Sequence, residues 1–110
     1  MTYNEYRLKA IKEIVEIITG FKLASKCRKK ASAKVIFANL CINELQMDTL
    51  EIANYLNCHR SAIYQYVKIH NNKYDTRWDD LYIKCLDTYN SVIEDYNVVN
   101  EVKKNILINI

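Results

Sequence analysis

The sequence has no proline and a single glycine, Gly20, among its 110 residues. Proteins built from sheets need turn residues at intervals of about 8–12 positions, and proline and glycine are the commonest of these. Their scarcity argues against a β-sandwich or a β-barrel. We therefore predict an all-α fold, a compact domain of five to six helices joined by short polar turns.

Long apolar runs are also absent. No segment approaches the roughly 18 apolar residues that a membrane span requires. The first residues, Met1 to Glu5, lack the basic region and apolar run of a secretory signal. We therefore expect a cytoplasmic protein with no membrane partner.

Motifs for metal binding and catalysis are missing as well. The four cysteines lie far apart without a CxxC pair, and no histidine is placed to complete a zinc site. We expect free thiols, with Cys41 and Cys85 as small core residues, and neither a metal nor a cofactor. With two histidines and no Ser–His–Asp, paired-carboxylate or phosphate-loop pattern, the chain is not expected to be an enzyme.

Apolar residues recur every three or four positions, the period of a helix with one buried face. We predict a single domain over residues 1–96, because a chain of this length has room for one core. Its helices are expected over about 2–20, 30–45, 48–56, 60–70 and 75–96.

Residues 97–110 are predicted to form a C-terminal helical extension. Val99, Val102, Ile106 and Ile110 keep a helical spacing there. The extension is too apolar for a free tail, so it either packs back on the domain or contacts a second copy or another protein. We expect it to pack back.

Charge is distributed unevenly along the chain. From Ile17 to Asn43 there is no acidic residue, whereas many acids follow after Asp75. The basic stretch contains Lys22, Lys26, Arg28, Lys29, Lys30 and Lys34. Such an asymmetry is typical of a nucleic-acid face, and a solvated lysine-rich loop explains it equally well.

Residues 49–68 fit a helix-turn-helix. Ala53 supplies the small residue at the close helix contact, and Asn57 tolerates the left-handed backbone of the turn. The apolar positions that join the two helices are Ile52, Leu56, Ile63 and Tyr66. A plain helical hairpin is the alternative.

The second helix of this motif is predicted to expose DNA-binding side chains. These are His59, Arg60, Ser61, Tyr64, Gln65 and Lys68. Arginine at the start of a recognition helix pairs with both acceptors of a guanine. Gln65 suits adenine or a phosphate, Lys68 suits a phosphate, and His59 suits the DNA backbone. His70 is expected at the surface without a role.

Several of these residues occur in an order that resembles a known family. They are Ser25–Lys30, Ala38–Leu45, Glu51–Ala53, Leu56–Asn57 and Ser61–Ile63. Over about residues 10–90 the chain is similar to the C-terminal DNA-binding domain of DnaA, the bacterial replication initiator. The resemblance implies binding of double-stranded DNA, with the recognition helix in the major groove and the basic loop in the minor groove.

By position, the resemblance assigns Lys26, Arg28, Lys29 and Lys30 to the loop, and Arg60, Ser61 and Ala62 to base reading. The family usually has Asp-His-Thr or Asp-His-Ser where this chain has His59 to Ala62, so we expect a different or relaxed sequence preference. Because no Walker motif is present, the resemblance implies a regulator of replication or transcription without ATPase activity, in a bacterial cell or a phage-infected one.

A protein–protein interaction module is the rival interpretation. In that case the aromatic fifth helix or the apolar extension binds a partner and the helix-turn-helix is scaffold. Salt dependence separates the two, because phosphate-driven binding weakens steeply with salt and an apolar interface does not.

Overall fold

The computed structural model describes residues 2–24, 31–71 and 76–108. All regular structure within these ranges is helical, so the predicted all-α class is confirmed. The helices are α1 (Tyr3–Thr19), α2 (Ala31–Leu45), α3 (Thr49–Leu56), α4 (Arg60–Asn71) and α5 (Thr76–Ile108).

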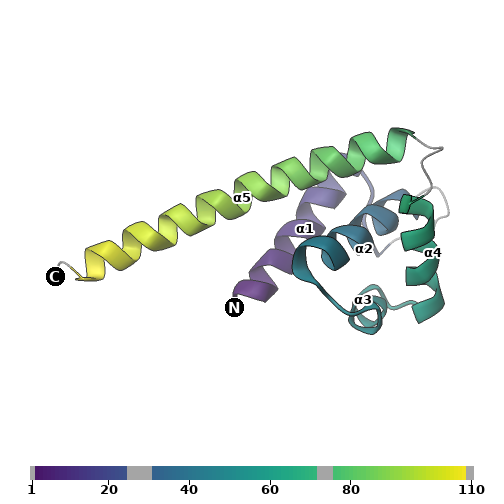
Figure 1. Ribbon diagram of the computed structural model, residues 1–110, viewed down its shortest axis with the longest axis horizontal. Helices are drawn as coiled ribbons and strands as arrows, with labels where there is room; N and C mark the ends of the chain where they lie inside the picture. Colours follow the sequence, from purple (N-terminus) through teal and green to yellow (C-terminus); the bar gives the residue numbers. More distant parts are fainter. Residues whose placement is uncertain (1, 25–30, 72–75, 109–110) are drawn as a thin grey trace.

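Helix α2 forms the centre of the fold. It contacts α1, α3, α4 and α5, which surround it in Figure 1. Ala33, Phe37, Leu40 and Cys41 are fully buried at helical spacing along it. In the structure Val35, Ile36, Ala38 and Asn39 are buried as well. A helix with neighbours on every side buries nearly its whole surface, and this makes α2 the core of the domain.

The ends of α1 follow the local sequence. The Thr2 side chain accepts a hydrogen bond from the Glu5 N–H, and the Glu5 carboxylate accepts one from the Thr2 N–H. These two reciprocal bonds form a capping box. At the other end Gly20 has a φ of 77°, and its N–H donates to the Glu16 carbonyl. Glycine adopts this left-handed conformation at no steric cost.

Helix α5 corrects one expectation about the C-terminal end. Residues 97–108 do not pack back on the domain, because α5 continues through them to Ile108. At about 1.5 Å per residue, its 33 residues give a rod of about 50 Å. Its second half projects beyond the other helices in Figure 1 and accounts for the 54 Å length of the molecule.

Arg7 joins three elements at the base of this projection. Its Nε donates to the Tyr89 hydroxyl on α5 at 2.7 Å, and its Nη2 donates to the Glu44 carbonyl near the end of α2 at 2.6 Å. A cation at a helix C-terminus also interacts favourably with the helix dipole. Arg7 therefore fixes α1 and α5 against the core helix.

Candidate nucleic-acid interface

Helices α3 and α4 are joined by the predicted three-residue connection. Asn57 has a φ of 53°, and its N–H donates to the carbonyls of Ala53 and Asn54. Ala53 is almost completely buried between the helices, and Ile52 and Ile63 are fully buried beside it. The residue types that the close helix contact and the turn require therefore lie where the sequence placed them.

Asn39 fixes α4 on the core. This buried side chain donates from Nδ2 to the Val35 carbonyl at 2.8 Å and to the Tyr66 carbonyl of α4 at 3.1 Å. The second bond links α2 to α4 across the core. This bond was not predicted, because an asparagine in an apolar helix gives no sign in the sequence of its distant partner.

The outer side of α4 presents the side chains predicted to contact DNA. Five of them are exposed and lie on one side of the helix, because successive members are one or three residues apart. They are Arg60, Ser61, Tyr64, Gln65 and Lys68. We call these five residues the α4 strip. Helix α4 contains no acidic residue, so the strip carries the positive charges of Arg60 and Lys68 without a compensating acid on the same helix.

Arg60 is held at the start of the strip. Its Nε donates to the Thr49 hydroxyl at 3.2 Å, and its guanidinium lies 5.8 Å from the centre of the Tyr64 ring. These contacts connect the first turns of α3 and α4. No hydrogen bond from its two Nη groups occurs within the described ranges, so their N–H donors remain available to a ligand.

His59 caps α4, a role that the sequence analysis did not assign to it. The ring Nδ1 accepts from the Ser61 N–H at 3.1 Å and lies 2.9 Å from the Ser61 hydroxyl oxygen. Because Nδ1 accepts from a backbone N–H, the proton of the neutral ring is on Nε2. His59 is exposed, so this Nε2–H is a donor at the N-terminus of α4.

The predicted basic loop is described only at its edges. Lys26, Arg28, Lys29 and Lys30 lie outside the described residues, whereas Lys34 is half-buried on α2. Ala24, the last described residue before the loop, lines a hollow of about 430 Å³ together with Lys34, Asn57 and Lys12 of α1. The loop therefore starts beside the α3–α4 turn, and Lys12 adds a cation that the sequence analysis missed.

Lys34 acts electrostatically on Cys58, which lies in the turn between α3 and α4. Burial raises the pKa of the Cys58 thiol, and the positive charge of Lys34 opposes part of that rise. Lys34 lines the same hollow as Asn57, so it lies beside the turn between α3 and α4. Among the described residues, Lys34 is a predicted cation that lies beside the α3–α4 pair.

Other candidate chemistry receives no support from the described residues. They contain no group of three or more His, Cys, Asp or Glu side chains arranged to hold a metal ion. Cys41 and Cys85 are buried as predicted, and burial raises their thiol pKa values to about 12 and about 11. His70 is half-buried, with its ring 4.3 Å from that of Tyr82, and is therefore less of a surface residue than predicted.

No helix among residues 2–24, 31–71 and 76–108 is long and apolar enough to cross a membrane.

No protein-family model, curated protein or solved structure matches the chain. The resemblance to the DnaA domain therefore rests on the motif residues alone.

Proposed function

We propose that this protein binds double-stranded DNA through α4, with sequence preference, and regulates replication or transcription without ATPase activity. Helix α4 enters the major groove as the recognition helix of a helix-turn-helix. The basic segment before α2 contacts the DNA backbone or the adjacent minor groove. The site of action is the cytoplasm of a bacterial cell or a phage-infected one.

The observation that carries the proposal is the α4 strip. Its five exposed side chains are hydrogen-bond donors or acceptors, and they follow one another along one side of a helix that has no acid. A major groove admits one helix and offers its donors and acceptors along the length of that helix. A helical hairpin serving only as scaffold has no need for this arrangement.

Arg60 is suited to read a base. It stands in the first turn of α4, where recognition helices approach base edges. The Thr49 hydroxyl and the Tyr64 ring restrict the conformations of its side chain before binding, and this lowers the entropy cost of the contact. Its Nη donors match the O6 and N7 acceptors of guanine.

The remaining strip and the neighbouring cations are suited to the phosphates. Lys68 lies two turns after Arg60, and the His59 Nε2–H adds a donor at the helix N-terminus, where anions bind favourably. Lys34 and Lys12 line the hollow beside the α3–α4 turn. Together these groups provide contacts that hold the helix on the duplex without reading its sequence.

Fluorescence anisotropy tests the proposal directly. A labelled duplex containing the DnaA box and a scrambled duplex are each titrated with the protein at several salt concentrations. We expect binding whose affinity falls by about 10³-fold or more between 50 and 200 mM salt if six or more phosphates are contacted. Absence of binding to both duplexes at low salt would refute the proposal.

A protein-interaction function is the second candidate, and the projection of α5 favours it. The extension of this helix continues past the body of the molecule and has apolar residues at helical spacing. Binding through this helix does not compete with DNA binding through α4, because the two lie on different parts of the molecule (Figure 1).

A further inference from the structure

The ring of Tyr64 on α4 is only partly covered by the rest of the molecule. Its side chain is 53% exposed, more than that of any other described tyrosine. The other exposed tyrosines have ring partners, because Tyr55 stacks on Phe37 at 5.5 Å and Tyr3 stacks on Tyr96 at 5.6 Å. Within the described ranges, the Tyr64 ring stacks on no other ring.

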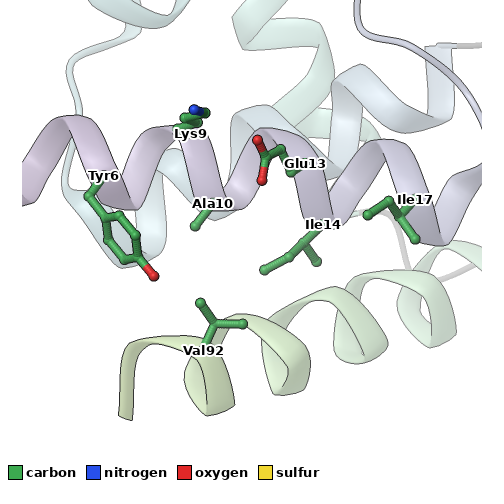
Figure 2. Close-up of a pocket in the computed structure, with 7 residues that line it drawn as sticks. All are labelled: Tyr6, Lys9, Ala10, Glu13, Ile14, Ile17 and Val92. Atoms are coloured by element: carbon green, nitrogen blue, oxygen red, sulfur yellow. The ribbon is translucent and has the colours of Figure 1, made fainter. Parts of the chain in front are cut away.

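The surroundings of Tyr64 are also polar, which is not true of the exposed apolar surface elsewhere. Ile17 of α1 is 79% exposed, but it borders an apolar groove in which Ala10 and Ile14 face Val92 of α5, as Figure 2 shows. The four other side chains of the α4 strip are polar. Tyr64 is therefore the aromatic member of a face that otherwise offers hydrogen bonds and charge.

Arg60 limits which part of a duplex this ring can contact. Its Nε donates to the Thr49 hydroxyl at 3.2 Å, which leaves its Nη groups to pair with the O6 and N7 atoms of a guanine. The guanidinium lies 5.8 Å from the centre of the Tyr64 ring. Successive bases of a strand are about 3.4 Å apart along the duplex. The ring centre therefore lies within two base-pair steps of the guanine that Arg60 contacts.

The edges of the bases in the major groove offer one apolar group to such a ring, the methyl group on C5 of a pyrimidine. Thymine carries this group, and so does 5-methylcytosine. We propose that Tyr64 contacts this methyl group, and that the preferred site has a C5-methylated pyrimidine within two base pairs of the guanine. This proposal rests on the proposed function, because Tyr64 meets a base only when α4 enters the major groove.

The contact with Arg60 prepares the ring for this role. A tyrosine side chain has two rotatable bonds, so little entropy is lost when it is ordered. The guanidinium beside the ring restricts it further before DNA binds. Burial of one methyl group against the ring corresponds to an affinity change of about fourfold.

Replacement of thymine by deoxyuridine tests the contact, because it removes the methyl group and leaves every hydrogen-bonding group of the base in place. The wild-type protein first selects its preferred duplex from a random pool. The guanine read by Arg60 is the one that Arg60→Ala no longer distinguishes from 7-deazaguanine. Anisotropy then measures binding to duplexes in which each thymine within two base pairs of this guanine is replaced in turn.

We expect the wild type to bind one of the uracil duplexes about fourfold more weakly than the thymine duplex. Tyr64→Ala should bind the two equally, because the ring is gone. Tyr64→Phe is the matched control, since it keeps the ring and removes only the hydroxyl group, and it should retain the fourfold difference. Where the selected site has cytosine at that position, methylation of its C5 should strengthen wild-type binding by about the same factor.

The proposal is overturned if the wild type binds methylated and unmethylated duplexes equally at every pyrimidine within two base pairs of the guanine. A difference that Tyr64→Ala retains, or that Tyr64→Phe abolishes, also overturns it, as does a selected site without a guanine read by Arg60. In each of these cases the protein still prefers one DNA sequence, so DNA binding with sequence preference stands. A pool from which no preferred sequence emerges refutes that preference and this contact together.

Discussion

His59 shows how a single residue can act both in the fold and at a binding face. Its Nδ1 accepts the Ser61 N–H that would otherwise lack a partner at the start of α4. The same hydrogen bond leaves the Nε2–H on the opposite side of the ring, directed toward solvent. Because the cap fixes the first turn of α4, it also fixes the position of Arg60.

Removal of this cap is expected to destabilise the protein. His59→Ala should lower the free energy of unfolding by about 1 kcal/mol, because the first turn of α4 loses its side-chain acceptor. His59→Asn should lose much less, since asparagine caps helices well. Urea unfolding followed by circular dichroism measures both, with Gln65→Ala as an exposed control on the same helix. Equal stability of the alanine variant and the wild type would contradict the capping role.

Buried thiols make stability depend on alkaline pH. Burial raises the pKa of Cys41 from 9.0 to about 12, so the folded protein keeps a proton that the unfolded chain releases. The stabilisation is fully present below pH 9 and is lost as the pH rises toward about 12.

The expected result is a free energy of unfolding that falls with pH above 9. Cys85 contributes with the same sign, because burial raises its pKa from 9.0 to about 11. Cys41→Ala should reduce the slope of stability against pH, whatever its effect on stability at neutral pH. An identical slope in this variant would show that the Cys41 thiol is accessible to water in the folded state.

At the scale of elements, the position of α4 depends on a polar contact with the core helix. The Asn39 amide reaches the Tyr66 carbonyl from inside an otherwise apolar helix. A buried hydrogen bond of this kind is worth little net energy when made, yet a buried group left without its partner is costly. Asn39 therefore selects one orientation of α4 on α2.

Asn39→Leu is expected to lower the free energy of unfolding by about 1–2 kcal/mol, because it removes the donor to the Tyr66 carbonyl while keeping the volume. Thermal unfolding measures the change. Asn54→Leu is the matched control, since Asn54 is exposed on α3. If both substitutions had the same effect, the bond to Tyr66 would not be what holds α4.

The helices that the sequence predicted correctly are those whose ends depend on local contacts. Thr2 and Glu5 lie within one turn of each other, and the left-handed conformations of Gly20 and Asn57 depend on the residue type itself. The hydrogen bonds from Arg7 to Tyr89 and from Asn39 to Tyr66, in contrast, join residues that are far apart in the sequence. No pattern along the chain reveals such pairs.

Helix α5 was divided at residue 96 for a related reason. Asn97 and Asn100 weaken the apolar period there, but neither glycine nor proline interrupts the backbone, so the helix continues. For the candidate site, the exposed positions of α4 followed from the period of 3.6 residues. The contacts of His59 with Ser61 and of Arg60 with Thr49 did not, because side-chain conformations decide them.

At the scale of the whole molecule, the proposed activities occupy different regions. Helix α4 lies at one end of the body, whereas residues 97–108 of α5 project from the other (Figure 1).

If α4 carries the DNA contacts, substitution of its two cations must weaken binding, and anisotropy titrations of Arg60→Ala and Lys68→Ala measure this. On the preferred duplex, Arg60→Ala should cost about 1–3 kcal/mol of binding free energy and should reduce discrimination against a scrambled duplex. Lys68→Ala should weaken binding to all duplexes alike and lower the salt slope by about 1. Lys84→Ala, on α5, should change nothing. If both α4 variants bound DNA with the wild-type affinity, α4 would not carry the DNA contacts, and these would lie elsewhere on the protein.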